Sequence, residues 1–178
     1  MTVIDLSTHR PVRRFASTAA RCSRWALSPD GRLLAAAGLS GRVHVVHRVT
    51  GERLPTPPEL PHEVYSLGFA PGGDRLLAGE ADGVVRVWEV ATGKERTCLH
   101  GHHAAVYQAG FSRDGRRLLS AGLDGQVLVR DADSGAVQHS HRLPGKALCA
   151  AIAVDGRHVG AGTGAAGCFL LELPRRAR

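Results

Sequence analysis

Short runs of alternating apolar and polar residues follow one another along most of the chain, and turn sequences separate them. In Arg42–Val49 and in Val84–Val90, valines alternate with polar or charged residues. Alternation with a period of two is typical of a β-strand that buries one face. Turns such as Pro29-Asp30-Gly31 join the runs, because proline presets φ for a turn and glycine accepts a positive φ. We therefore expect an all-β fold of short antiparallel strands.

The strand pattern recurs at a fixed interval. The segment Ala81–Gly93, ADGVVRVWEVATG, has a counterpart 42 residues earlier at Leu39–Gly51 and another 42 residues later at Leu123–Gly135. A period of about 40–45 residues with about four strands per unit is typical of β-propeller blades. We predict one domain over residues 1–178, with the end of a leading blade at 2–18, blade 1 at 19–55, blade 2 at 62–98, blade 3 at 102–141 and an incomplete blade 4 at 145–173.

Both ends of the array fall inside a repeat. Ile4 aligns with Trp88, 84 residues on, and the last unit stops before its outer strand. An open array leaves apolar faces and strand edges uncovered. Three interpretations follow. The chain is a fragment of a larger propeller protein, it closes alone as a four-bladed ring with Pro11–Ala16 as the outer strand beside Cys168–Leu173, or two chains complete an eight-bladed ring.

Composition narrows the classes of function. The chain has 23 Lys and Arg against 16 Asp and Glu, a formal charge of +7, but Lys94 and Lys146 are its only lysines. Abundant Arg, Ala and Gly are typical of a GC-rich coding sequence, and a polyanion site needs its basic residues clustered on one face. The positive charge is therefore not by itself a sign of nucleic-acid binding, although Arg13-Arg14 and Arg175-Arg176 keep that alternative open.

Four cysteines without a CxxC pair indicate small buried residues in a reducing compartment. The N-terminus lacks the apolar core of a signal peptide, and no run approaches the ~20 apolar residues of a membrane helix. We expect a cytoplasmic protein with no membrane partner.

Two repeats carry a shared set of motifs. The third repeat has Leu99-His100-Gly101-His102, Phe111-Ser112, Asp114-Gly115, Leu118-Leu119-Ser120, Asp124-Gly125 and Asp131; the second has Phe69, Leu76-Leu77, Asp82-Gly83, Val87-Trp88-Glu89 and Thr92-Gly93. These motifs resemble the WD40 repeat family, and the likeness covers nearly the whole chain. The resemblance implies a WD40-type β-propeller of about four blades, partial or small, made of four-stranded antiparallel sheets. It also implies a non-catalytic scaffold that binds a protein or peptide and needs no cofactor.

The resemblance further implies a buried hydrogen-bond chain of His, Ser, Asp and Trp in each blade. In the third repeat His102, Ser120 and Asp124 fall at three of these positions, but Arg130 stands at the tryptophan position. A partly satisfied buried network stabilises less than a complete one. We expect softer blades than is usual in the family.

The second repeat retains a different part of this network. Asp82 and Trp88 match, Ala78 replaces the serine, and His62 is two residues out of register.

Two tyrosines suggest a binding surface. Tyr65 and Tyr107 are 42 residues apart, and each directly follows the valine that starts an innermost strand. By family resemblance they lie on the rim of the propeller where partners dock, and aromatic side chains suit that role. Packing between blades is the alternative. The other predicted rim residues are Glu63, Ala81, Ala105 and Leu123.

Catalytic and metal-binding interpretations have weaker support. His100-x-His102-His103 and His139-x-His141 are possible ligand sets, but His102 already has a structural role by resemblance. Ser120 with His102 is a possible nucleophile and base, but no oxyanion-type glycine loop accompanies them. The stretch Gly160–Gly167 lacks the Lys-Ser/Thr ending of a phosphate loop.

An enzyme that uses the central channel of the propeller remains the competing class of function. Such an enzyme needs acidic or histidine side chains on its innermost strands. The four predicted innermost strands contain no His, Asp or Glu: Cys22–Ser28, Val64–Ala70, Val106–Ser112 and Ala147–Ala153. We therefore predict no catalytic residues and no metal site.

Overall fold

The structure is a computed structural model that describes residues 2–4, 11–14, 22–164 and 167–174. These residues form strands and turns without a helix, so none of them belongs to a helix able to cross a membrane. The strands form five antiparallel sheets in which consecutive strands pair. The fold is all-β, as the alternating pattern predicted.

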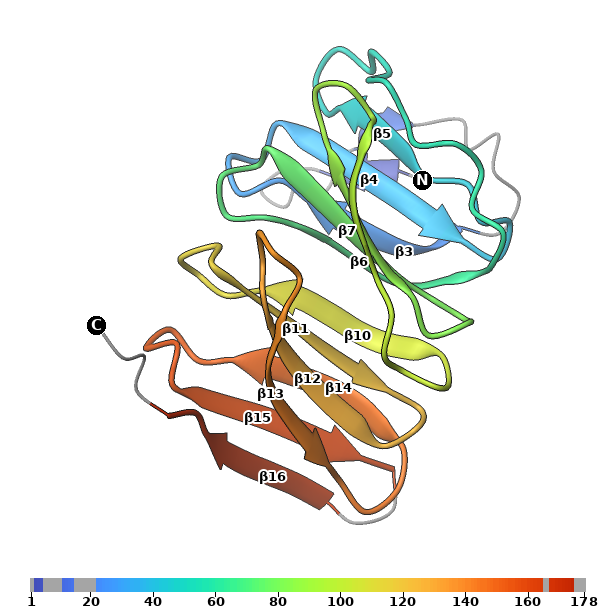
Figure 1. The fold of residues 1–178 in the computed structure, drawn as a ribbon. Helices are drawn as coiled ribbons and strands as arrows, with labels where there is room; N and C mark the ends of the chain where they lie inside the picture. The colour runs from blue at the N-terminus through green and yellow to red at the C-terminus, as the bar shows by residue number, and fades with distance from the viewer. Residues whose placement is uncertain (1, 5–10, 15–21, 165–166, 175–178) are drawn as a thin grey trace.

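Four of the sheets are stacked in chain order, and we call them blades 1 to 4 (Figure 1). Blade 1 contains β3 (Cys22–Leu27), β4 (Leu33–Gly38) and β5 (His44–His47). Blade 2 contains β6 (Val64–Phe69), β7 (Arg75–Glu80), β8 (Val85–Glu89) and β9 (Glu95–Leu99). Blade 3 contains β10 (Val106–Phe111), β11 (Arg117–Gly122), β12 (Gln126–Asp131) and β13 (Val137–Arg142). Blade 4 contains β14 (Ala147–Ile152), β15 (His158–Thr163) and β16 (Gly167–Glu172).

Blade 1 has three strands, whereas the repeat led us to expect a fourth after Thr50-Gly51. The only pairing there is an isolated bridge between Val46 and Arg53. The loop that follows contains four prolines between residues 55 and 61. Proline has no backbone N–H to donate to a neighbouring strand, so the outer strand cannot extend.

The innermost strands β3, β6, β10 and β14 lie next to one another in this order and hold the stack together. Alternate residues of each blade face opposite neighbours. In β7, Leu76 and Ala78 belong to the apolar cluster shared with blade 1, and Leu77 belongs to the cluster shared with blade 3. In β11, Leu119 and Ala121 face blade 4. Each interior blade therefore buries both of its faces.

The tight-turn glycines recur because the neighbouring loop packs directly on them. Gly83 has a φ of 92°, and a Cβ atom there would lie 2.6 Å from the carbonyl oxygen of His102. Gly125 has a φ of 80°, and a Cβ atom there would lie 2.6 Å from the carbonyl oxygen of Gly145. Both the positive φ and the lack of space require glycine.

The fifth sheet is a hairpin of β1 (Thr2–Ile4) and β2 (Pro11–Arg14). The four-bladed closure that we considered places 11–16 beside the last strand of blade 4. In the structure β2 pairs with β1, and β16 pairs with β15 alone among the described strands; residues 15 and 16 lie outside the described part. Figure 1 shows blades 1 and 4 at opposite ends of the stack, so the array is open.

Candidate functional site

Tyr65 and Tyr107 meet at the junction of blades 2 and 3. Their ring centroids are 5.7 Å apart with an interplanar angle of 22°, which is a stacked arrangement. Tyr65 lies on β6 and Tyr107 on β10, directly after the first residue of each strand, and both side chains are partly exposed. The pair thus packs across two blades and still presents aromatic surface to solvent.

Arg24 of β3 extends this aromatic pair towards blade 1. Its guanidinium carbon lies 5.8 Å from the centroid of the Tyr107 ring, and its Nε donates a hydrogen bond to the Tyr65 carbonyl oxygen. A guanidinium within about 6 Å of an aromatic centroid makes a cation–π contact. Arg24 was not among the predicted rim residues, because nothing in its own repeat marks it.

Glu63 fixes the polar end of Tyr65. The Tyr65 hydroxyl donates to Glu63 Oε2 over 2.8 Å. This hydrogen bond and the negative charge of Glu63 raise the pKa of Tyr65 above its ordinary value. The hydrogen bond therefore orients the phenol and favours its neutral form.

The remaining predicted rim residues lie at equivalent places in two blades. The Ala81 N–H donates to the Glu63 carbonyl oxygen, and the Leu123 N–H donates to the Ala105 carbonyl oxygen, each over 2.9 Å. The tight turn of each blade is thus tied to the loop that enters its innermost strand. The structure brings these residues into two matching clusters beside the tyrosines.

Two exposed leucines occupy further positions of this rim. Leu39, 42 residues before Ala81, is 41% exposed, and Leu148, which follows the first residue of β14, is 37% exposed. Sequence reasoning missed both residues, although their places in the repeat would have identified them. We call the set formed by Leu39, Glu63, Tyr65, Ala81, Ala105, Tyr107, Leu123 and Leu148 the tyrosine rim.

The predicted network residues of blade 3 lie together in its interior. His102 Nε2 is 2.9 Å from Ser120 Oγ, and His102 Nδ1 is 3.1 Å from Asp124 Oδ1. Asp124 also accepts hydrogen bonds from the backbone N–H groups of His103 and Gln126. The order of groups is that of a nucleophile, base and acid, but Ser120 is fully buried and cannot meet a substrate. The network instead ties together a loop, a strand and a tight turn.

Burial sets the protonation of this network. Burial lowers the pKa of His102 despite its hydrogen bond to Asp124. Burial by itself would raise the pKa of Asp124. The hydrogen bonds from His103, Gln126 and His102 outweigh this effect, so the pKa of Asp124 is lowered. The resting pair is therefore a neutral imidazole beside an ionised carboxylate.

Arg130 fills the space expected for a tryptophan in blade 3. It is 5% exposed, and its guanidinium donates to the carbonyl oxygens of Gly135 and His100. Its Nε has no hydrogen-bond partner among the described residues. Burial lowers the pKa of Arg130.

Blade 2 does not bring Asp82 and Trp88 into one network. Asp82 Oδ2 lies 3.3 Å from His62 Nε2 near the surface, while Trp88 is buried with no partner for Nε1 among the described residues. Leu60 and Ala78, at the positions equivalent to His102 and Ser120, belong to the same apolar cluster as Trp88. Apolar packing replaces the hydrogen bonds of blade 3.

A buried ion pair that sequence reasoning missed lies in the same blade. Glu80 is fully buried, and its Oε1 accepts a hydrogen bond from Arg86 Nε over 2.8 Å. Arg86 also binds Glu95 over 2.7 Å. Burial raises the pKa of Glu80, and Arg86 partly opposes this change. These residues hold β7 to β8 and β9.

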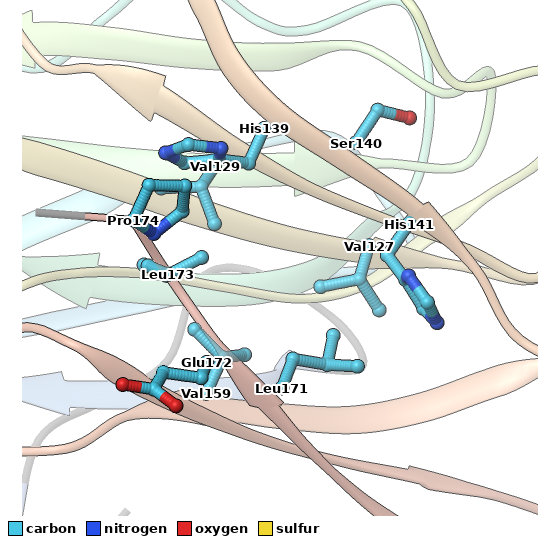
Figure 2. A pocket seen from close by; sticks show the side chains of 10 residues that line it. All are labelled: Val127, Val129, His139, Ser140, His141, Val159, Leu171, Glu172, Leu173 and Pro174. Atoms are coloured by element: carbon cyan, nitrogen blue, oxygen red, sulfur yellow. The ribbon is translucent and has the colours of Figure 1, made fainter.

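The other histidine candidates do not form a metal site. Among the described residues, no group of three or more His, Cys, Asp or Glu side chains is placed to hold a metal ion. His139 and His141 lie at opposite ends of a pocket of about 170 Å³ between β13 and blade 4, with Val127 and Val129 between them (Figure 2). His100 Nε2 lies 3.5 Å from Cys98 Sγ.

The arginines considered for nucleic-acid binding give no structural support to that interpretation. Arg175 and Arg176 lie outside the described residues, and only the backbone is described at Arg13 and Arg14 of β2.

Comparison with known proteins gives one family. The repeat described as "WD domain, G-beta repeat" matches residues 58–89 and 93–131. A search of curated proteins gave no match. The two matched segments span the strands of blade 2 and most of blade 3, and blades 1 and 4 repeat the same strand order. The chain is therefore a member of the WD40 repeat family, and its fold is a partial WD40 β-propeller.

Proposed function

We propose that this protein is a non-catalytic interaction module that binds a protein or peptide partner at the tyrosine rim. WD40 repeats are in general protein-interaction scaffolds. The observation that carries the proposal is the stacked pair of Tyr65 and Tyr107, which joins two blades and remains partly exposed. Tyrosine presents a large rigid surface with a polar tip, and such residues dominate the energetics of many interfaces.

The composition of the rim defines the partner class. Exposed leucines lie at other positions of the rim, and Glu63 and Arg24 place one charge of each sign beside the tyrosines. A peptide with an apolar or aromatic anchor and polar flanks matches this surface. The proposal requires no cofactor, and it places the protein in the cytoplasm.

The absence of catalysis is part of the proposal. The innermost strands contain no His, Asp or Glu in the segments described for β3, β6, β10 and β14. Such side chains do most of the general acid–base work in enzymes. The one serine–histidine–aspartate set of blade 3 is buried within its own sheet.

A displayed peptide library tests the proposal even though the natural partner is not identified. Peptides selected on the wild-type chain are expected to bind it with micromolar dissociation constants in calorimetry. The double substitution Tyr65→Ala with Tyr107→Ala should weaken binding at least about tenfold, since aromatic anchors each contribute on the order of 1–2 kcal/mol or more.

The matched control is Val137→Ala, at a residue on β13 that is 51% exposed and lies outside the tyrosine rim. It should leave binding unchanged. Selected peptides that bind the double variant as tightly as the wild type would remove the rim as the binding surface.

A further inference from the structure

The pocket between β13 and blade 4 has apolar walls. On blade 3 it is lined by Val127 and Val129 of β12, and on blade 4 by Val159, Leu171 and Leu173. Leu171 is half-buried and the other four residues are buried. The pocket has a volume of about 170 Å³. An apolar cavity of about 150 Å³ in a protein core is large enough to bind benzene. The pocket therefore has room for one aromatic ring system.

The strand register shows that Leu171 stands where the other blades have a longer side chain. In blade 2 the second residue of β7 pairs with Trp88. The second residue of β11 in blade 3 pairs with Arg130, and the second residue of β15 in blade 4 pairs with Leu171. The three residues also occupy the same place in their own blades, because each faces the blade before it.

In blade 2 the corresponding space is filled by the indole ring of Trp88. Trp88 is 1% exposed and belongs to an apolar cluster with Val43 and Val45 of blade 1. These two valines precede Val127 and Val129 by 84 residues, which is two repeats. The same kind of wall therefore packs against an indole ring elsewhere in this chain. A leucine side chain reaches less far than a tryptophan, so at blade 4 the space beyond Leu171 stays open as the pocket.

Two imidazoles stand at the ends of the pocket. His139 and His141 pair with the two valines of β12, so their side chains share a face with these valines. At the same two positions blade 2 has Thr97 and Leu99. Figure 2 shows the two imidazoles at opposite ends of the apolar floor. A neutral imidazole has one ring nitrogen that accepts a hydrogen bond. The pocket thus offers acceptors to an N–H or O–H group of a bound ring.

The charges at the pocket favour a neutral ligand. Among the described residues that line it, none is a lysine or an arginine. Its one acidic residue, Glu172, is paired with Arg157 over 2.8 Å. An anion would therefore meet a carboxylate and an apolar floor without a cation to pair with, and burial of an unpaired charge is costly.

We propose that the pocket between β13 and blade 4 binds a small neutral heteroaromatic molecule of about the size of indole. The ring packs against Leu171, in the place that the Trp88 ring takes in blade 2, and its polar ring atom donates to His139 or His141. An apolar pocket with a few polar groups that fix orientation is the usual form of a small-molecule site. The pocket shares no residue with the tyrosine rim, so the inference goes beyond the proposed function.

Indole is the probe for the full chain. Calorimetry should show one site with a dissociation constant on the order of 0.1–1 mM. Leu171→Trp should weaken binding at least about tenfold, because its own ring occupies the pocket, and it should raise the unfolding temperature, because it fills a cavity. Leu170→Trp is the matched control. Leu170 is the neighbouring residue on the same strand but is 75% exposed on the opposite face, so this variant should bind indole like the wild type.

The histidines are tested by a separate variant. His139→Ala combined with His141→Ala should weaken indole binding about three- to tenfold, as expected for the loss of one hydrogen bond. Unchanged binding would overturn the assignment of the polar contact to these imidazoles.

Nuclear Overhauser effects locate the ligand in the wild type and require no variant to fold. Indole protons should contact the methyl groups of Val127, Val129 and Leu171. Absence of saturable binding, contacts confined to other methyl groups, or an equal loss of affinity in Leu170→Trp and Leu171→Trp would overturn the proposal.

Two further measurements separate this site from a polypeptide-binding surface. The variant with Tyr65→Ala and Tyr107→Ala should bind indole like the wild type, so failure of the tyrosine rim proposal leaves this one standing. A short peptide with a central tryptophan should bind the pocket no more tightly than indole. A peptide that makes the same methyl contacts with an affinity more than about tenfold higher would assign the pocket to a polypeptide and overturn the small-molecule proposal.

Discussion

Gly122 lies so close to His102 that a Cβ atom on residue 122 would come within 2.6 Å of His102 Nδ1 and within 2.7 Å of Asp124 Oδ1. The φ of Gly122 is not in the left-handed region, so the backbone does not require glycine at this position. Space alone requires it. The buried histidine of blade 3 thus depends on a missing side chain on the neighbouring strand.

Gly122→Ala should therefore destabilise the protein. The methyl group would push the imidazole away from Ser120 and Asp124, and overpacking of this kind costs about 1–3 kcal/mol in the free energy of unfolding. Urea denaturation followed by circular dichroism measures the change. Gly110→Ala is the control on β10 of the same blade, because a Cβ atom there has nothing within 4 Å. A loss in Gly110→Ala as large as that in Gly122→Ala would contradict the steric explanation.

The same position explains why blade 2 is built differently. Glu80 stands where blade 3 has Gly122, and Leu60 stands where blade 3 has His102. A side chain at residue 80 takes the space that a buried histidine would need. Blade 2 instead buries Leu60 with Ala78 and pairs Glu80 with Arg86. Blade 3 thus fills this region with hydrogen-bonded polar side chains, whereas blade 2 fills it with apolar side chains and an ion pair.

Replacing His102 and Ser120 by the leucine and alanine found at these positions in blade 2 should show strong energetic coupling between the two residues. Ser120→Ala leaves His102 Nε2 without its partner, and His102→Leu leaves Ser120 Oγ without its partner. A buried polar group that loses its hydrogen bond costs about 1–3 kcal/mol. The double variant resembles blade 2, so it should lose less stability than the sum of the single variants. Chemical unfolding of the four proteins gives the coupling energy, and simple additivity would show that the hydrogen bond between the two residues contributes nothing.

Much of the fold could be predicted from the sequence because the repeat encodes it locally. The turn residues and alternating valines gave most strands of the four blades within a few residues, including β12 at Gln126–Asp131, but the fourth strand expected for blade 1 is not formed. The partial network of blade 3 was also visible, since its residues stand at fixed places in the repeat. The Arg24 contact with Tyr107 was not, because it joins blades 1 and 3 across blade 2. The buried Glu80 also escaped notice, because a charged residue in a strand is usually exposed.

The strand pairing at the two ends of the array could not be determined from the sequence. Sequence alignment placed Ile4 opposite Trp88, but it could not say whether Pro11–Ala16 pairs with β1 or with the last strand of blade 4. Strand pairing is a long-range property, and only the observed register decided between the two.

Stability should fall as the pH is lowered from about 7, in part through His102. Its folded pKa is below the unfolded value of about 6.5, so between these two values the unfolded chain binds a proton that the folded chain does not. The folded state therefore loses up to about 1.4 kcal/mol per pH unit in this window, and nothing at higher pH. Asp124, Arg130 and His103 all face this imidazole. The free energy of unfolding should be measured against pH for the wild type and for His102→Leu, and the variant should lack the loss of stability due to His102. Parallel profiles for the two proteins would contradict a role for His102.

The chain contains two tyrosines, so the tyrosine rim can be examined by a direct titration. In Tyr107→Phe the absorbance change at alkaline pH reports Tyr65 alone. Its pKa should lie above the ordinary value of 10.0, because ionisation breaks the hydrogen bond to Glu63 and places two negative charges together. Adding Glu63→Gln should lower this pKa, since the amide carries no charge. An unchanged pKa after removal of the carboxylate would show that the Tyr65 hydroxyl does not donate to Glu63 in solution, and that this end of the rim is not held ready for a partner.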